Sequence, residues 1–361
     1  MNWNYHTHFE RWVKHKTWLS KIYDYRSPII HEDGSYQVQD PRTGELVVMM
    51  GITDLISFYI VTKEPLPLSD HDGFKTLPGR RRSKVKKEPS SSNRGMYNSK
   101  KTHISIQAIV LPGVGRVDVV TPNGRPRKEL PPVLQLRGAK RGTLVHRQIE
   151  DFVYCESLEA MRRKPANHIG IHYFAPLLLL RMVALRTRPL LSEFRTHDAA
   201  IGCATKVDTI GIDEYGRLVF FENKTGYSNG KFTKLSRERW LCPALAERAA
   251  RFPCTPRNKA VVQVVLGAAM TMRMLNIPAH MIRAIVLRVD EYGVCDEEVN
   301  SDFFSALSII LYEYLTPIVA NVRATAERRR RHEIDMLAIE KRRKKTTTTT
   351  GRKKKDAMLI L

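Results

Sequence analysis

Two acids and a lysine stand out in a stretch of the chain that is otherwise strongly apolar. Asp208 lies inside a β-branched run, and Glu222 and Lys224 close a second apolar run at residues 217–224. The four residues before the second run read DEYG, which is typical of a tight turn, so the sequence predicts a β-hairpin. Side chains two apart on a strand share a face, so Glu222 and Lys224 are expected together, near Asp208 on the partner strand. Burying these groups is costly unless something charged lies among them.

These residue types suit the hydrolysis of a phosphodiester bond. That reaction must activate water and stabilise charge on phosphoryl oxygens, and hard divalent cations such as Mg²⁺ or Mn²⁺ do both. Asp208 and Glu222 are therefore predicted metal ligands, and Lys224 is expected to orient the attacking water and offset negative charge. The structural alternative is a strand pair at the surface, in which the two acids form ion pairs with Lys206 and Lys224.

Further polar residues lie on the elements that would position the hairpin. His146 and Glu150 are four apart in a predicted helix at residues 142–163, so they share one helical face. Glu193 precedes the hairpin in a predicted strand, and Gln263 is a polar residue within an otherwise apolar helix at residues 257–275. The alternative for His146 is a histidine that only packs its helix against the core. The alternatives for Glu193 are an acid that contacts the metal ligands without binding the metal, or a purely structural acid.

The remaining periodicity indicates one α/β domain with a mixed central sheet flanked by helices. Other elements are predicted as follows: a strand followed by a short helix at 46–61, a hairpin at 103–120, helices at 175–186, 234–251 and 303–339, and a strand at 283–289. The expected organisation is a helical and strand region at 1–64 packing on the core, a basic disordered linker at 65–103, the core at 104–322, and a basic tail at 323–361 that passes from helix to disorder.

The composition points to a polyanionic partner. The formal net charge is +23, and most of the excess lies in the linker and the tail. Nucleic acid is the first candidate and an anionic membrane surface the second. The five cysteines are scattered without a C-x-x-C pair, which argues against a thiolate-bound metal and fits a reducing compartment. No apolar run of membrane-spanning length and no signal peptide are expected.

The order of these residues resembles the PD-(D/E)xK nuclease superfamily, in particular its RecB-like branch, which includes phage lambda exonuclease and mitochondrial genome-maintenance exonucleases. The resemblance covers about residues 141–290, where G-x-x-x-H-x-x-x-E, Asp, E-x-K and a helical Gln follow one another. Val207 replaces a proline common in that branch, and Gly267 stands where its Gln motif has a tyrosine. The resemblance implies a restriction-endonuclease-like core. The residues it implies for the site are Asp208, Glu222, Glu150, His146 and the backbone carbonyl of Asn223 at the metal, and Gln263, Lys231, Lys234 and Arg237 at the DNA.

The expected function is Mg²⁺-dependent hydrolysis of double- or single-stranded DNA by a stand-alone exonuclease acting in replication, repair or recombination. The alternatives are a catalytically inactive DNA-binding protein of the same fold and a basic DNA-packaging protein. The basic segments are expected to add salt-sensitive DNA affinity. Residues 79–87 or the tail are candidate signals for a nuclear import receptor, which would place the protein, as a cellular or viral component, in the nucleus. A homo-oligomer is left open.

Overall fold

The computed structural model describes residues 22, 29–32, 35–39, 44, 46–62, 105–111, 115–121, 131–155, 158–226, 231–236, 238–290 and 293–358. The expected basic linker at 65–103 lies outside these residues.

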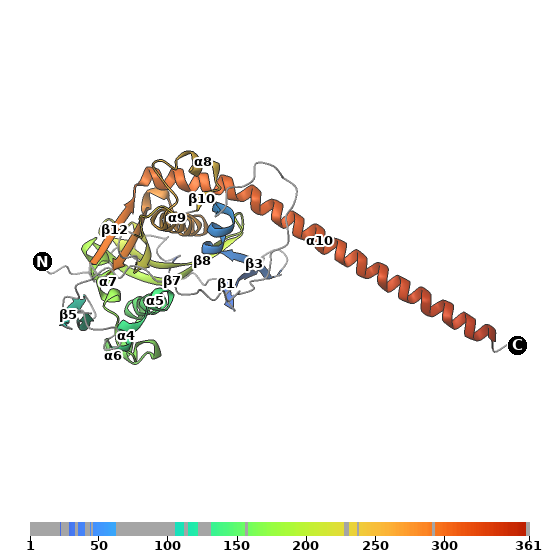
Figure 1. Ribbon diagram of the computed structural model, residues 1–361, viewed down its shortest axis with the longest axis horizontal. Coiled ribbons are helices and arrows are strands. Elements are labelled where there is room, and N and C mark those ends of the chain that lie inside the picture. Colours follow the sequence, from blue (N-terminus) through green and yellow to red (C-terminus); the bar gives the residue numbers. More distant parts are fainter. Residues whose placement is uncertain are drawn as a thin grey trace, which may run out of the picture.

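A mixed eight-stranded sheet forms the centre of the fold (Figure 1). Its strand order is β1-β2-β3-β8-β9-β11-β12, and β7 also pairs with β8. The central strand β9 is antiparallel to β8 and parallel to β11, so the predicted mixed sheet flanked by helices is confirmed. The strands of this sheet are β1 (Ile29–Glu32), β2 (Ser35–Gln39), β3 (Leu46–Gly51), β7 (Thr187–Asp198), β8 (Cys203–Asp213), β9 (Leu218–Thr225), β11 (Ile282–Asp290) and β12 (Gly293–Val299). A separate hairpin consists of β5 (Ser105–Leu111) and β6 (Gly115–Thr121).

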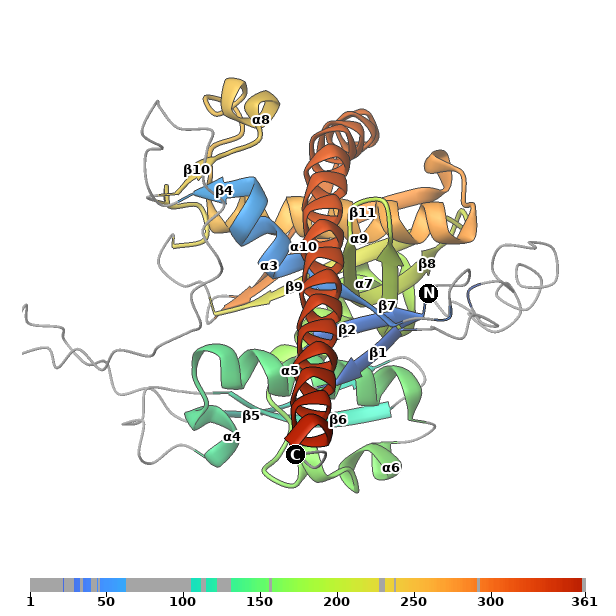
Figure 2. The same cartoon turned by 90° about the vertical axis from the view of Figure 1, so that its right-hand side faces the viewer.

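Helices cover both faces of the sheet (Figures 1 and 2). α9 (Pro256–Leu275) and the first part of α10 (Ser301–Met358) pack on one face, and α5 (Gly138–Tyr154) and α7 (Phe174–Ala184) pack on the other. The shorter helices are α3 (Ile52–Leu55), a π-helical turn (Ile56–Ile60), α4 (Pro132–Gln135), α6 (Leu158–Arg162), α8 (Pro243–Glu247) and two 3₁₀ turns (Pro165–Asn167 and Ala279–Met281).

The sequence of β9 explains why the sheet is buried on both sides. Leu218 and Phe220 belong to the core beneath α9, whereas Val219 and Phe221 belong to the core against α5 and α7. All four side chains are fully buried, which is the pattern of a central strand with helices on both faces. Because this strand ends in Glu222, Asn223 and Lys224, its polar end emerges from an apolar layer.

Two of the predicted helices differ in the structure. The helix predicted at 142–163 is divided, since α5 ends at Tyr154 and α6 begins at Leu158. The prediction of a helix at 234–251 was wrong. This segment holds the two-residue strand β10 (Arg239–Trp240), which pairs with β4 (Val61–Thr62), and it also holds the short helix α8. Pro243 at the start of α8 has no N–H for a helix continuing from the preceding residues, which explains the break.

α10 is longer than predicted, and it continues as a helix to Met358 through the part of the tail in which disorder was expected. Its segment Ser301–Leu337 is also long and apolar enough to cross a membrane by length and composition, so the expectation that no such run exists was wrong. Part of this apolar character is used within the fold, because Leu307, Leu311 and Leu315 are fully buried in the core beside α9.

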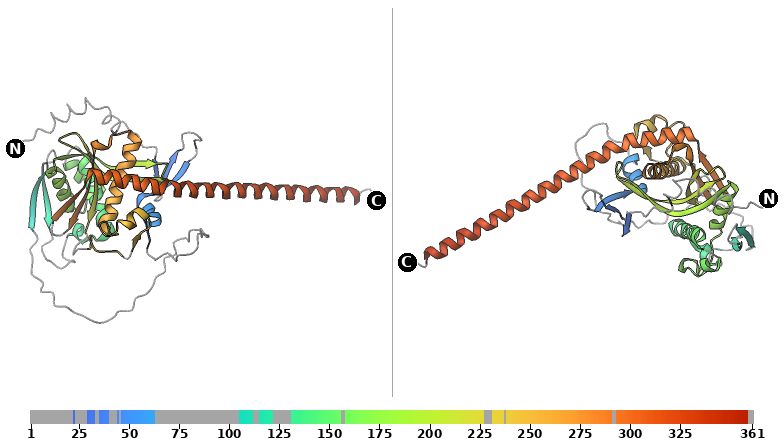
Figure 3. Two further views of the ribbon diagram at one scale, coloured as in Figure 1. Left: turned by 90° about the horizontal axis from the view of Figure 1, so that it is seen from above. Right: turned by 180° about the vertical axis from the view of Figure 1, so that it is seen from behind.

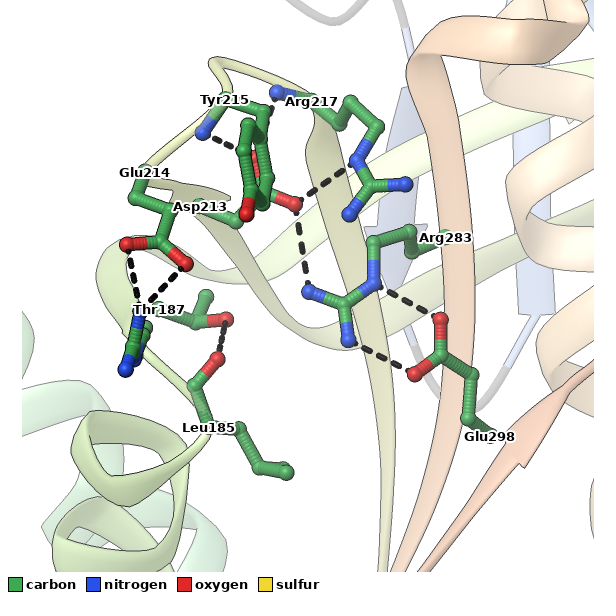
Figure 4. A network of polar contacts seen from close by, with 9 residues as sticks. Leu185, Thr187, Asp213, Glu214, Tyr215, Arg217, Arg283 and Glu298 are labelled. Carbon is green, nitrogen blue, oxygen red and sulfur yellow. Dashed lines mark hydrogen bonds and ion pairs between the residues drawn. The ribbon is translucent and has the colours of Figure 1, made fainter.

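A buried ion-pair network closes the turn between β8 and β9 at the end remote from the acids (Figure 4). The Asp213 carboxylate accepts hydrogen bonds from the backbone N–H of Tyr215 and Arg217, and from the guanidinium groups of Arg217 and Arg283. Arg283 on β11 also donates twice to Glu298 on β12. The network ties three strands together and supports the register of the hairpin.

Candidate active site

The predicted hairpin is present, and its two strands separate where the acids lie. β8 and β9 pair from Ile212 and Leu218 as far as Thr209 and Phe221, and β9 then continues alongside β11 alone. The carboxylate of Asp208 spans this fork, since its Oδ2 accepts a 2.7 Å hydrogen bond from the backbone N–H of Asn223. The side chain therefore replaces a strand-to-strand hydrogen bond and is held at the point of divergence.

Glu222 and Lys224 lie together on one face of β9, as their spacing predicts. Lys224 Nζ lies 2.5 Å from Glu222 Oε1, and both side chains line a cavity of about 380 Å³. Asn223, between them, is buried on the opposite face, where its amide donates to Thr209 Oγ1 over 3.1 Å. The alternation of the strand thus directs the acid and the lysine into the cavity and the amide into the core.

His146 approaches the fork from α5. Its Nδ1 lies 3.4 Å from Asp208 Oδ1 and 3.5 Å from Glu193 Oε1. Its Nε2 lies 3.1 Å from the carbonyl oxygen of Asn223, an atom that can only accept, so this nitrogen carries the hydrogen. The neighbouring Val145 and Ile149 are buried, and they fix α5 on the sheet so that the imidazole reaches the fork.

Glu193 enters the group through an unusual backbone conformation. Its φ is +52°, in the left-handed region that non-glycine residues seldom adopt, although it lies inside β7. Tyr154 on α5 holds the preceding residue, because its hydroxyl donates to Ser192 O and accepts from Ser192 N, each over 2.8 Å. From the sequence, Glu193 was predicted to be a supporting or structural acid. In the structure it lies beside His146, as Asp208 does.

The site concentrates charge. Burial, and next the neighbouring Glu222, raise the pKa of Asp208. Burial alone would lower the pKa of His146, but Asp208, Glu193 and Glu222 together raise it to about 9. Burial would raise the pKa of Glu193, but hydrogen bonding and attraction from His146, with help from Lys206, lower it. The imidazole therefore acts as the cation that balances the clustered carboxylates.

The wall of the cavity opposite α5 comes partly from the N-terminal segments of the chain. Tyr36 of β2 and Thr53 of α3 line the cavity, as does Gln263 of α9. Gln263 Nε2 donates to Thr53 Oγ1 over 3.2 Å, so the predicted glutamine does face the site. Gly267, which stands where the related motif has a tyrosine, also lines this cavity, and a Cβ there would meet only a Val207 methyl group, at 3.4 Å.

A second cavity of about 790 Å³ shares His146 and Lys224 with the first. Its wall includes Arg137 and Arg141 at the start of α5, and the Arg141 guanidinium packs over the Phe174 ring at 5.1 Å. Reasoning from the sequence missed both arginines. The basic residues around Gly138 were the only signal, and they could not be distinguished from ordinary surface charge.

Other predicted site residues lie farther out. Glu150 follows His146 by one helical turn, and burial followed by Glu193 raises its pKa, but it is not one of the three residues whose ligand atoms gather. Lys231 and Lys234 are exposed and do not line either cavity, and Arg237 lies outside the described residues.

Within the part of the chain that the structure describes, His146, Glu193 and Asp208 form a group that could hold a metal ion. Each offers one ligand atom, and these atoms lie within 4.8 Å of one another. Carboxylate oxygens are the ligands that Mg²⁺ and Mn²⁺ prefer, whereas an imidazole nitrogen is more typical of Zn²⁺ or Fe²⁺, so the donor atoms do not select one metal. The predicted ligand Glu222 lines the same cavity, whereas the carbonyl of Asn223 is engaged by the imidazole.

Comparison of the chain with protein-family models finds no match, and comparison with curated proteins also finds none.

Proposed function

We propose that the protein is a divalent-metal-dependent nuclease that hydrolyses phosphodiester bonds in DNA. The observation that carries this proposal is the convergence of Asp208, Glu222 and Lys224 with His146 in one cavity, at the fork of two strands. These residues are separated in the sequence, and a phosphodiester hydrolase needs such acids, a lysine and a histidine together at one place.

The donor atoms fit a divalent cation. Because His146 Nε2 donates to a backbone carbonyl, the neutral ring directs the lone pair of Nδ1 toward Asp208 and Glu193. A cation among these atoms would take the place of the imidazole proton and balance the same carboxylates. Such an ion, when bound, supplies Lewis acidity and lowers the pKa of a coordinated water.

The chain's own residues would do the remaining work. Lys224 brings its positive charge into the cavity beside Glu222, where it would orient the attacking water and offset negative charge on a phosphoryl oxygen. Arg137 and Arg141 provide positive charge in the adjoining cavity, where neighbouring phosphates of the same strand would lie. Gln263 and Tyr36 would contact the nucleotide on the other side. On this division of roles, the scissile phosphate would lie beside Lys224, which lines both cavities.

The test is cleavage of linear and covalently closed circular DNA in Mg²⁺ or in EDTA. Asp208→Asn and Lys224→Ala are each expected to lower the cleavage rate by about 100-fold or more, as removal of a preorganised charged group does. Lys164→Ala is the matched control, because Lys164 is exposed and lines neither cavity. Sparing of the circles would select an exonuclease.

Absence of Mg²⁺-dependent cleavage by the wild-type chain, or equal cleavage by Asp208→Asn, would sink the proposal. DNA binding without cleavage in the wild type would favour the inactive DNA-binding protein instead.

A further inference from the structure

The C-terminal part of α10 leaves the body of the protein as an isolated helix (Figures 1 and 3). The helix packs on the core as far as Val319, which is 8% exposed. Beyond it, residues 327–329 and 331–337 are all exposed, and this second run covers nearly two full turns. We call residues 324–358 the arm. In the described part of the arm, no face of the helix is set against the body.

The arm carries its basic residues in three clusters. Its sequence holds 13 Lys or Arg against 5 Asp or Glu, gathered at 328–331, 341–345 and 352–355. Successive residues of an α-helix are about 100° apart, so a run of four or five basic residues surrounds the axis. A run of this kind therefore does not form a single stripe along a helix.

This distribution discriminates between partners. A helix on a membrane surface needs an apolar face opposite its basic face. A coiled coil needs apolar residues every 3.5 positions along its length, whereas the exposed apolar residues of the arm, Ile334, Met336 and Leu337, are confined to about one turn of the described part. A helix in the major groove of duplex DNA has a phosphate backbone on each flank, so basic residues on opposite sides of the helix can both meet phosphates. The major groove of duplex RNA is too narrow for this arrangement.

The length also fits. An α-helix of 35 residues is about 50 Å long, which exceeds one turn of B-DNA at about 34 Å. Three basic clusters along that length could contact phosphates over more than one helical turn. The helix does not need to be ordered by its partner, because it is already continuous to Met358.

We propose that the arm binds duplex DNA through its phosphate backbone, independently of the candidate active site. The binding is sequence-independent, and it does not rest on the proposed hydrolysis. It gives the protein a second contact with DNA, separated from the cavity by the length of the projecting helix.

The experiment measures fluorescence anisotropy of a labelled 30-base-pair DNA duplex with the full chain in EDTA, over a range of KCl concentrations. The arm variant carries Arg328→Gln, Arg329→Gln and Arg331→Gln, because glutamine preserves helical propensity. We expect affinity to fall by about tenfold at moderate salt, and the slope of log K against log salt to decrease by about two. Wild-type affinity for the single strand is expected to be clearly weaker than for the duplex.

The matched control removes the same charge from the body through Arg162→Gln, Lys164→Gln and Arg251→Gln, all at exposed positions. It is expected to change affinity by less than about twofold, since these residues would not contact phosphate. Equal loss in both variants would reduce the effect to net charge and overturn the proposal. No loss in the arm variant, or equal binding of single strand and duplex, would overturn it as well. Anionic vesicles competing for the arm as effectively as the duplex would assign it to a membrane. Since EDTA prevents metal-dependent cleavage, these outcomes are separate from those for hydrolysis.

Discussion

Glu193 reaches the candidate site only because its backbone adopts a left-handed conformation. A non-glycine residue in this region costs about 1–3 kcal/mol, and glycine avoids that cost. We therefore expect Glu193→Gly to have a free energy of unfolding about 1 kcal/mol higher than Glu193→Ala. Both variants lose the same carboxylate, so the difference isolates the backbone.

Urea unfolding in metal-free buffer measures this difference. The control is Arg195, two residues on in the same strand, whose φ is not positive. There, glycine is expected to be less stable than alanine by about 0.5–1 kcal/mol. If glycine were less stable than alanine at both positions, the backbone of Glu193 would not be strained.

His172 gives the fold a pH dependence of its own, on the α7 side of the sheet. It is 2% exposed, and its Nδ1 accepts a hydrogen bond from the backbone N–H of Phe174 over 3.1 Å. Burial, with Arg141 and Arg137 nearby, lowers its pKa to about 3. Between that value and the usual 6.5, the unfolded chain binds a proton that the folded protein excludes. Stability is therefore lost as the pH falls from about 6.5, by up to about 1.4 kcal/mol per pH unit.

Urea unfolding at pH 7.5 and pH 5 tests this contribution. His172→Asn can keep the acceptor for Phe174 but does not titrate. We expect the wild type to lose about 2 kcal/mol more than the variant between the two pH values. An equal loss of unfolding free energy in both proteins would show that the folded protein protonates His172 as readily as the unfolded chain does.

At the scale of elements, the β8–β9 hairpin is anchored at the end opposite its acids. The Asp213 carboxylate is 1% exposed and bonds to Arg217 and Arg283 (Figure 4). Asp213→Ala would leave Arg283 paired with Glu298, but it would remove the buried acceptor of Arg217 and of two backbone N–H groups, so it is expected to destabilise the protein by about 3–5 kcal/mol. Arg186→Ala is the matched control. Its pair with Glu214 involves a side chain that is 68% exposed, so a cost below about 1 kcal/mol is expected. Thermal unfolding of both variants distinguishes an anchor from incidental surface charge, because equal shifts would contradict the anchoring role.

Much of this element structure follows from local sequence. The hairpin, α9 and β11 are marked by apolar runs with clear ends, and all three are present near their predicted positions. The helix predicted at 234–251 did not form although the helical periodicity is real, because Pro243 and the pairing of Trp240 with β4 override it. The fork at Asp208, the conformation of Glu193 and the arrival of Tyr36 and Thr53 could not be predicted. Each depends on contacts between segments that are far apart in the chain.

At the scale of the whole molecule, the candidate site joins the N-terminal strands to the rest of the fold. Tyr36 and Thr53 contribute to the same cavity as His146, Asp208 and Gln263. An ion that binds only the folded arrangement must therefore stabilise the whole of it. At 100 times its dissociation constant, such an ion adds about 2.7 kcal/mol, which for a domain of this size corresponds to a rise in Tm of roughly 5–10 °C.

Thermal unfolding in Mn²⁺, Mg²⁺ and EDTA tests this coupling, and Asp208→Asn makes it specific. Without metal, the variant is expected to be at least as stable as the wild type, because it removes a buried charge beside Glu222 and its amide oxygen can still accept from the Asn223 N–H. With metal, the wild type should become the more stable protein, since only the wild type is stabilised by binding the ion. Glu313→Gln, at an exposed position on α10, is the control and should follow the wild type in every buffer. A variant that is unstable in EDTA would mean that Asp208 serves the fold rather than a cation, and an equal gain in variant and wild type would place the ion elsewhere.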